Sequence, residues 1–294
     1  MEKSCGSEMP RILFVMPYFG SWPFWMSFYL KSCSYNSSID WLFYTDCEPP
    51  QDAPSNVRFR KIGYEEYCQM VSDKLGIEFK AGNPYKLCDI RPALGYIHAD
   101  DLEGYDFWAF GDIDVVYGNL RNYYTNKRLS SKDLFSTHAR RIAGHLCILR
   151  NVPDIVNAYR DIPDWKARFS DTEHHALDEG AFSRLFMGHK NWPDWMRFCA
   201  EKLKRRSRRS EFVEAHSTYT LMPDGTKKTP DAWYWDNGGL TNTDLGTQEL
   251  PYLHFYRWKK QDWTGKGSRQ LVQHEHLHEE NKWKISGEGF QAVG

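Results

Sequence analysis

The sequence lacks a long uninterrupted hydrophobic run. Its most apolar stretch, residues 12–30, is broken by Pro17, Gly20 and Pro23 and cannot form one membrane-spanning helix. The N-terminus also lacks an apolar segment ahead of the first expected strand, which argues against a signal peptide. We therefore expect a soluble, cytoplasmic protein that is at most peripheral on the inner face of a membrane.

Charge of one sign and paired cysteines are lacking as well. The 38 Lys and Arg residues balance 39 Asp and Glu residues, and a formal net charge of −1 argues against a global electrostatic grip on nucleic acid. The seven cysteines are odd in number and never spaced as Cys-x-x-Cys, so we expect reduced thiols rather than a zinc motif or a disulfide framework. No glycine-rich phosphate loop, Gly-x-Ser-x-Gly elbow or His-Glu-x-x-His motif occurs.

What the sequence does contain is 294 residues, 41% hydrophobic and 16% aromatic, which suffice to bury a sizeable core. Short apolar runs alternate with segments of helical spacing. We expect strands over residues 11–16, 39–45, 57–62, 105–111, 134–138 and 146–149. We expect helices over residues 23–33, 65–75, 90–100, 154–160 and 176–186. This alternation predicts an α/β fold in which helices flank a mostly parallel, Rossmann-like sheet.

After about residue 205 the pattern changes to short apolar segments separated by turns. Pro-Asp-Gly at 223–225 and Asn-Gly-Gly at 237–239 are turn sequences between such segments. Residues 251–258 form the last expected strand of the series. We therefore expect a β-rich C-terminal extension, followed from residue 265 by a polar tail on the surface.

The sharpest local signal is the segment FWAFGDIDVVYGNL, residues 107–120, in which an apolar strand ends in Asp112 and Asp114. The carboxyl end of a strand in an open α/β sheet is where ligands bind. Two carboxylates placed there offer the hard oxygen ligands that Mg²⁺ or Mn²⁺ takes, and a cation would offset the cost of burying them. The alternative is that both acids cap the next helix or belong to a turn.

This motif and its surroundings resemble the GT-A glycosyltransferases, which use an Asp-x-Asp to hold a divalent cation against the diphosphate of a nucleotide sugar. The block NPYKLCDIRPALGYIHADDLEGYDFWAFGDIDVVYGNL, residues 83–120, is similar to glycosyltransferases of bacterial surface-polysaccharide (capsule and O-antigen) gene clusters. The resemblance covers about residues 11–260. It implies a single GT-A-like domain over residues 1–264, with a nucleotide-sugar-binding half over about 11–120 and an acceptor-side half over about 121–264. A polar tail over 265–294 would follow.

The same resemblance implies contacts between the N-terminal half and the donor. The segment 14–20, with Pro17 and Tyr18, resembles the element on which the nucleotide base and ribose rest, and Asp46 would face the base. Lys86-x-x-Asp89-x-Arg91 resembles a donor-contacting helix, whose cations would meet phosphate and whose Asp would meet a sugar hydroxyl. The alternative for this second group is an exposed cluster of charges.

Near the C-terminal end, LHFYRWKK, residues 253–260, resembles the segment that supplies a third metal ligand, which here would be His254. Lys259 and Lys260 follow and could neutralise the diphosphate, and Lys260 is taken as a donor contact. A core histidine whose hydrogen bonds are satisfied and a pair of solvated lysines are the alternatives.

Two further segments bear on the acceptor and on catalysis. Gly144 and His145 begin a returning strand, where a glycine lets backbone approach a sugar and the histidine could contact donor or acceptor. Asp178 and Glu179 begin a helix, and the resemblance to inverting GT-A enzymes implies that an acid at such a position deprotonates the acceptor hydroxyl, with Asp178 slightly favoured over Glu179. The alternatives are an ordinary glycine turn and two acids favoured by the helix dipole.

The segment EKLKRRSRRSEF, residues 201–212, packs six cations into 202–209. A solvated face is one interpretation, and contact with anionic lipid near a lipid-linked acceptor is the other.

Together with these features, the resemblance implies a metal-dependent glycosyltransferase of the hexosyltransferase type, active in bacterial surface-polysaccharide biosynthesis. It would use Mn²⁺ or Mg²⁺, a nucleotide-sugar donor (a UDP-sugar is favoured) and a glycan or lipid-linked oligosaccharide acceptor, with no nucleic-acid partner. The alternatives are a metal-dependent nucleotidyltransferase and a non-catalytic glycan-binding protein on a decayed transferase fold.

Overall fold

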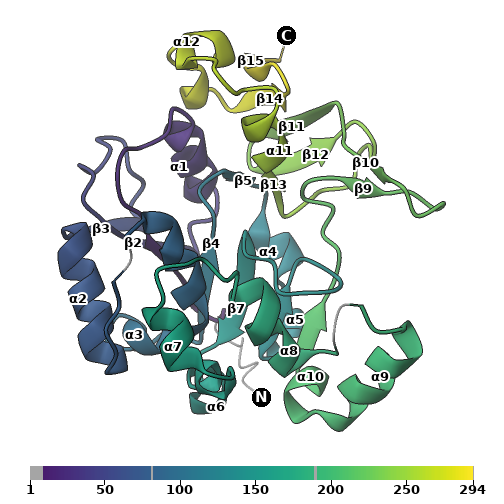
Figure 1. Cartoon of the computed structure of the whole chain (residues 1–294). Coiled ribbons are helices and arrows are strands. Elements are labelled where there is room, and N and C mark those ends of the chain that lie inside the picture. The colour runs from purple at the N-terminus through teal and green to yellow at the C-terminus, as the bar shows by residue number, and fades with distance from the viewer. Residues whose placement is uncertain (1–8, 81, 189–190, 294) are drawn as a thin grey trace, which may run out of the picture.

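The segment expected as a central strand forms β4 (Phe107–Gly111) at the middle of a seven-stranded sheet in the computed structural model (Figure 1). The structure describes residues 9–80, 82–188 and 191–293. The strand order is β3-β2-β1-β4-β7-β6-β8. The other strands are β1 (Ile12–Pro17), β2 (Ile39–Thr45), β3 (Val57–Lys61), β6 (Leu134–Ser136), β7 (Leu146–Arg150) and β8 (Ser210–Phe212).

This sheet is mostly parallel. β3, β2, β1 and β4 pair in parallel, and so do β6 and β8, whereas β7 runs antiparallel to both β4 and β6. One strand of the seven therefore opposes the rest, and the predicted α/β class is confirmed. The carboxyl ends of β1 and β4 lie side by side because these two strands are parallel neighbours.

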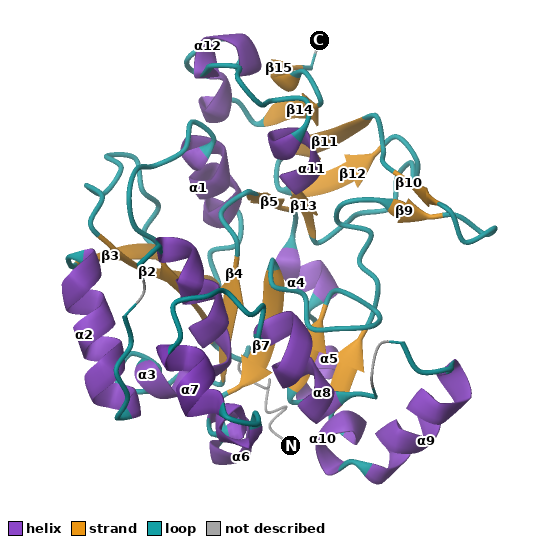
Figure 2. Cartoon of the chain, viewed as in Figure 1, coloured by secondary structure: helices purple, strands orange, loops and turns teal. Residues whose placement is uncertain are grey.

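Helices cover both faces of the sheet (Figures 1 and 2). The α-helices are α1 (Met26–Ser34), α2 (Tyr64–Leu75), α3 (Leu94–Ile97), α4 (Leu120–Tyr123), α5 (Asn126–Ser131), α6 (Pro153–Val156), α7 (Trp165–Ser170), α8 (Ser183–Phe186), α9 (Asp194–Leu203), α10 (Arg205–Arg208), α11 (Tyr256–Lys260) and α12 (Ser268–Leu271). Alternate residues of β1 serve the two cores: Leu13 and Val15 pack on the α2 side, and Phe14 packs on the α1 side. This explains why β1 reads as an unbroken apolar run.

Three expected elements differ in kind. Residues 84–93 form a 3₁₀ segment ahead of α3 rather than one α-helix over 90–100, and Pro92 lies inside it. The helix expected over 176–186 begins as a π-helical turn, Asp178–Phe182, before α8. The strand expected over 251–258 ends early: β13 (Tyr252–His254) is followed directly by α11.

The C-terminal extension is a four-stranded antiparallel sheet of order β12-β11-β14-β15. Its strands are β11 (Ala232–Asp236), β12 (Gly239–Asn242), β14 (Lys282–Ser286) and β15 (Gly289–Ala292), and a small hairpin of β9 (Thr220–Leu221) and β10 (Lys227–Lys228) precedes it. The prediction of a polar surface tail from residue 265 is wrong, because that segment forms β14 and β15. Trp283, Ile285 and Phe290 are fully buried, and Phe290 stacks on Phe28 of α1 at 4.0 Å.

The two sheets are joined by a short ribbon in which β5 (Val115–Tyr117) pairs antiparallel with β13. Six cysteines of the described residues carry free thiols, as expected, and Cys5 lies outside those residues. Within the described part of the chain, every helix is too short or too polar to span a bilayer.

Candidate active site

The two carboxylates of the Asp-x-Asp lie where the chain leaves the centre of the sheet. β4 ends at Gly111, and residues 112–114 turn into β5. Trp25 Nε1 donates a hydrogen bond to the Ile113 carbonyl at 3.0 Å, which holds the turn between the two acids. Asp114 is 5% exposed, whereas Asp112 is half-buried at the mouth of the site.

His254 completes a cluster with these acids. The β5·β13 ribbon sets His254 opposite Val115, next to Asp114 in the chain. Its Nε2 lies 3.5 Å from Asp114 Oδ1 and 3.8 Å from Asp112 Oδ2, and one ligand atom from each residue falls within 4.8 Å of the others. The buried Nε2 makes no hydrogen bond to the described residues. Two carboxylates and an imidazole nitrogen that no hydrogen bond from the described residues occupies fit a hard divalent cation.

Lys259 reaches the same cluster from α11. Its ammonium forms an ion pair with Asp114. Burial by itself would raise the pKa of Asp114, but the nearby His254 and Lys259 outweigh it and hold that pKa below its ordinary range. Lys260, the residue expected at the donor, lies over the exposed ring of Tyr256 instead, with Nζ 4.6 Å from the ring centre.

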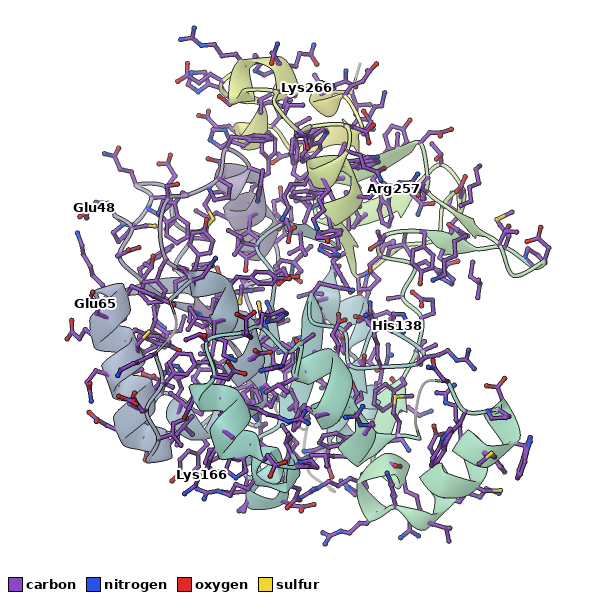
Figure 3. The ribbon with its side chains drawn as sticks, in the orientation of Figure 1. Glu48, Glu65, His138, Lys166, Arg257 and Lys266 are labelled. Atoms are coloured by element: carbon purple, nitrogen blue, oxygen red, sulfur yellow. The ribbon has the colours of Figure 1, made fainter. Side chains whose placement is uncertain are left out.

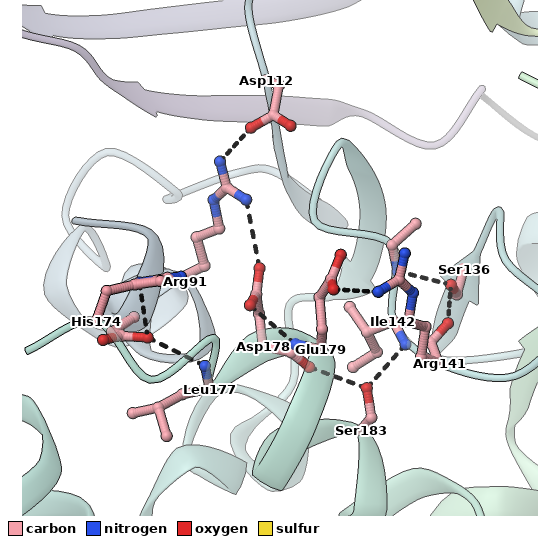
Figure 4. Close-up of polar contacts among 12 residues, drawn as sticks. Arg91, Asp112, Ser136, Arg141, Ile142, His174, Leu177, Asp178, Glu179 and Ser183 are labelled. Atoms are coloured by element: carbon pink, nitrogen blue, oxygen red, sulfur yellow. Dashed lines mark hydrogen bonds and ion pairs between the residues drawn. The ribbon is translucent and has the colours of Figure 1, made fainter. Parts of the chain in front are cut away.

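Arg91 links Asp112 to a second buried acid, Asp178 (Figure 4). Its guanidinium forms an ion pair with Asp112 and approaches Asp178 Oδ2 to 3.3 Å. Burial raises the pKa of Asp178, and the Arg91 charge only partly opposes that shift. Gly144 makes room for this link, since a Cβ there would lie 2.8 Å from Arg91 Nη1 and 3.0 Å from Asp178 Oδ2. Sequence reasoning had identified all four residues but not their contacts with one another.

Glu179 takes a different partner from its neighbour. It forms an ion pair with Arg141, also drawn in Figure 4, and its side chain is 30% exposed, against 3% for Asp178. Of the two expected catalytic acids, Glu179 is therefore the more open to the cleft.

Lys86 and Asp89 do not face the cleft, contrary to the expectation that they contact the donor. They form a buried ion pair with Lys86 Nζ 3.0 Å from Asp89 Oδ2. Lys86 also donates to the carbonyls of Arg168 and Glu173. Asp89 accepts hydrogen bonds from the backbone N–H groups of His175 and Leu177, at 2.8 and 3.0 Å. The pair therefore anchors the loop that leads into Asp178.

His145 lies against the metal-ligand candidate. Its ring stacks on that of His254, with centroids 4.5 Å apart, and its Nδ1 lies 2.5 Å from the Tyr252 hydroxyl. Burial lowers the pKa of His145 well below its ordinary value, and the nearby His254 and Arg141 lower it further.

Two cavities meet at this cluster. The first, of about 400 Å³, has mainly apolar and aromatic walls that include Pro17, Tyr18, Phe19 and Trp25. The second, of about 490 Å³, is more polar, and its lining includes His138 (labelled in Figure 3), Arg141, Gly144, His145, Asp178 and Glu179. Six residues line both: Tyr85, Cys88, Arg91, Asp112, Asp114 and Lys259.

Asp46, expected to face the base, does not line the first cavity. Its Oδ1 accepts a hydrogen bond from Gly20 N at 2.8 Å, so it holds the loop after β1. The structure also adds site residues that sequence reasoning passed over, among them Tyr85, Arg141 and Trp25. Tyr85 lies beside the Lys86-x-x-Asp89-x-Arg91 motif but outside it, and Trp25 and Arg141 lie in segments with no motif of their own, so the signal of each residue is weak.

The solved structures similar to this chain are distant. A galactosyltransferase named LgtC, solved with donor and acceptor sugar analogs, is 12% identical with a TM-score of 0.34, over 58% of this chain and 71% of that chain. Mouse xyloside xylosyltransferase 1 is 11% identical with a TM-score of 0.35, over 71% and 86%. A glycosyltransferase involved in glycosylation of the major capsid of PBCV-1 is 10% identical with a TM-score of 0.39, over 88% and 96%.

Similarities this weak carry no weight on activity. No curated protein matches the sequence. One family model, described as a family of unknown function (DUF6625), matches residues 14–292. The chain therefore belongs to this family of unknown function.

Proposed function

We propose that this protein is a metal-dependent glycosyltransferase that moves a sugar from a nucleotide-sugar donor to a hydroxyl of a glycan acceptor. The observation that carries the proposal is the position of the Asp112–Asp114–His254 cluster on the boundary shared by two cavities. A group-transfer enzyme with two substrates needs its charge-stabilising groups at such a junction, because the bond that breaks and the bond that forms share one atom.

The first cavity suits the nucleotide part of the donor. Its apolar and aromatic walls suit a flat base, and its volume lies in the range of small-molecule sites. Arg91 and Lys259 line it where it meets the second cavity, and a diphosphate bound there would need cations. Pro17 and Tyr18 keep their proposed role as donor contacts, and a UDP-sugar remains the favoured donor.

Asp112, Asp114 and His254 would hold Mn²⁺ or Mg²⁺. When bound, such an ion acts as a Lewis acid that stabilises negative charge on a leaving diphosphate. The protein groups around it have their own tasks. Lys259 offsets the charge of Asp114, and Arg91 holds Asp112 and Asp178 in fixed positions.

The second cavity suits the acceptor sugar. We assign Glu179 as the acid that would accept the proton of the acceptor hydroxyl, because it lines this cavity and is the more exposed of the two candidates. Asp178 is the buried neighbour that positions Arg91.

We also propose a peripheral contact with an anionic bilayer. Only part of the basic run 202–209 would take part in this contact. Arg206 forms ion pairs with Asp154 and Asp161, and Arg209 forms one with Asp133. Their charges are therefore already compensated within the protein.

The helix α9 next to this run is amphipathic but turned outward. Trp195, Phe198 and Leu203 share one face by spacing and are 69%, 57% and 85% exposed, whereas Arg197 of the opposite face is buried. The exposed cations Lys202, Arg205 and Arg208 lie on or next to this helix. Aromatic rings flanked by cations are typical of helices that lie in an anionic membrane interface, where a lipid-linked acceptor would be found.

The test of the transferase site is calorimetric binding of UDP, with GDP and CDP for comparison, with and without Mn²⁺. We expect one nucleoside diphosphate to bind, with an affinity that depends on the metal and falls about 10- to 100-fold in Asp114→Asn. Asp100→Asn is the control, since that exposed acid pairs only with Lys74 among the described residues. If folded protein binds none of the three nucleotides, the proposal is wrong and a glycan-binding role is favoured.

A further inference from the structure

The second cavity has a polar interior but an aromatic rim. Among the described residues that line it, none is Val, Leu, Ile, Met, Phe or Trp, and the large apolar faces come from Tyr85, Tyr219 and Tyr256. Tyr85 is 62% exposed and Tyr256 is 42% exposed, so these two rings lie where the cavity opens to solvent. Single exposed aromatic residues are ordinary on a protein surface, but two on the rim of one cavity form a local apolar surface.

Tyr219 is the least open of the three tyrosines. Its side chain is half-buried, and the Lys227 ammonium lies 4.4 Å from its ring centre, a cation–π contact that covers one face of the ring. Tyr256 has a similar contact with Lys260, but its exposure leaves more ring surface open to solvent. Tyr85 and Tyr256 are therefore the rings that a ligand at the rim can reach.

The ring of Tyr85 is held in place from both the backbone and the side. Tyr85 lies in the first turn of the 3₁₀ segment, and its backbone N–H donates to Asn83 Oδ1 at 2.9 Å. The imidazole of His174 packs against the phenol ring with centroids 4.5 Å apart, and His174 Nδ1 lies 3.4 Å from Oδ1 of the buried Asp89. A ring that is already held loses little conformational entropy when a ligand covers it.

A pyranose ring has the chemistry that such a rim requires. When its hydroxyl groups are equatorial they point outward from the edge of the ring, and the axial C–H bonds make each face apolar. Burying such a face on an aromatic ring removes apolar surface of both partners from water. The hydroxyl groups at the edge of the sugar remain free to meet polar side chains of the interior such as Arg141 and Glu179.

We infer that the rings of Tyr85 and Tyr256 form a stacking subsite for a pyranose ring of the acceptor at the rim of the second cavity. This inference rests on the proposed function, since that function places the acceptor glycan in this cavity. It names the acceptor class, a glycan that carries a pyranoside with an unbroken C–H face. The aromatic rings bind this face, and the two phenol hydroxyl groups are not needed for the contact.

The stacking is tested with methyl β-glucoside, which has two C–H faces, and with sorbitol, a polyol that has no ring. In saturation-transfer NMR of the full chain, the aromatic protons of the protein are saturated, with and without UDP and Mg²⁺. We expect transfer to the glycoside, strongest at the protons of one ring face, and much weaker transfer to sorbitol. Equal transfer to both compounds, or no transfer to the glycoside, would overturn the inference.

Substitutions show whether the rings or the hydroxyl groups bind the sugar. We expect Tyr85→Ala and Tyr256→Ala each to weaken glycoside binding about 3- to 10-fold, whereas Tyr85→Phe and Tyr256→Phe keep the wild-type affinity. Trp192→Ala is the matched control, because Trp192 is as exposed as Tyr256 and lines neither cavity. Unchanged affinity in both Ala variants, or an equal loss in the Phe variants, would overturn the inference.

Calorimetry with UDP on the same proteins separates this subsite from the donor site, because Tyr85 also lines the first cavity. If Tyr85→Ala lowers the affinity for UDP and leaves the affinity for the glycoside unchanged, the ring serves the donor and the inference is wrong. If the protein binds the glycoside through these rings but no nucleotide, the subsite stands and the proposed transferase function fails. Metal-dependent UDP binding without any binding of the glycoside would overturn the subsite alone.

Discussion

At the scale of single residues, the site depends on close approach as much as on charge. Gly144 is the clearest case, because a methyl group there would lie 2.8 Å from Arg91 Nη1 and 3.0 Å from Asp178 Oδ2. The ion pair between those residues exists only because position 144 has no side chain.

Gly144→Ala should therefore displace Arg91 and reduce metal-dependent UDP binding about 10-fold, at a cost of about 1–3 kcal/mol in stability. Calorimetry and urea unfolding measure the two effects. Gly180→Ala is the matched control, since a Cβ there meets nothing within 4 Å and the residue lies in the neighbouring helical turn. Equal UDP affinity in both variants would show that the Arg91–Asp178 link is not needed.

A second residue-scale prediction concerns acid stability. Asp133 accepts hydrogen bonds from Arg150 at 2.8 Å and from Arg209 at 2.6 Å. Burial by itself raises the pKa of Asp133, but these two cations outweigh it and lower that pKa below the ordinary value. A carboxyl whose folded-state pKa is lowered stabilises the fold above its unfolded-state pKa, and this contribution is lost as the pH falls through the folded-state value.

Asp133→Asn should then cost about 1–3 kcal/mol of unfolding free energy at pH 7. The gap between wild-type and variant should narrow as the pH drops below about 4. Urea unfolding at a series of pH values measures both. A gap that is the same at pH 3 and pH 7 would contradict an electrostatic role for Asp133.

At the scale of elements, apolar runs and turn residues in the sequence predicted where strands and helices lie. They did not predict which segments pair across the chain. β2 has the bounds expected for it, and α2 ends before Gly76, which adopts a φ of 62°. Both depend on neighbours in sequence. The pairing of β5 with β13, which sets His254 beside Asp114, joins segments more than 130 residues apart and has no local signal.

The structure also shows why the sequence pointed to Lys260 at the site, whereas Lys259 is the lysine that contacts Asp114. Residues 251–258 were expected to form one strand, but β13 ends at His254 and the chain turns at once into α11. The helical turn directs Lys259 to Asp114 and places Lys260 over Tyr256. Because the chain forms a helix here and not a strand, the lysine at the site is Lys259 and not Lys260.

The outward face of α9 gives an element-scale prediction. The double variant Trp195→Ser, Phe198→Ser should bind vesicles of phosphatidylglycerol and phosphatidylcholine at least about 10-fold more weakly. Each ring that enters the bilayer contributes about 1–2 kcal/mol to binding through burial of its apolar surface. Leu221→Ser is the control, since Leu221 is 48% exposed in the β9–β10 hairpin. Sedimentation with the vesicles measures binding. Equal binding by all three proteins, or binding that does not depend on the anionic lipid, would exclude this surface.

At the scale of the whole molecule, the C-terminal sheet packs against the β5·β13 ribbon that carries His254. The sequence suggested a polar surface tail, because the charged and histidine residues of 265–294 obscure the few apolar positions that β14 and β15 bury, Trp283, Ile285 and Phe290. Trp283 stacks on Trp235 at 4.5 Å, and Trp235 Nε1 donates to the carbonyl of Tyr117 in β5. The tail is thus linked through β11 to the ribbon that carries His254.

Trp283→Ala should therefore destabilise the whole chain by about 3–5 kcal/mol, the usual cost of removing a fully buried Trp side chain. Because the same packing fixes the β5·β13 ribbon, metal-dependent UDP binding should weaken in the folded variant too. His276→Ala is the control from the same segment, with a side chain that is 73% exposed. Urea unfolding and calorimetry test both points. If Trp283→Ala unfolds at the same urea concentration as the control, residues 265–294 are not part of the core that positions the site.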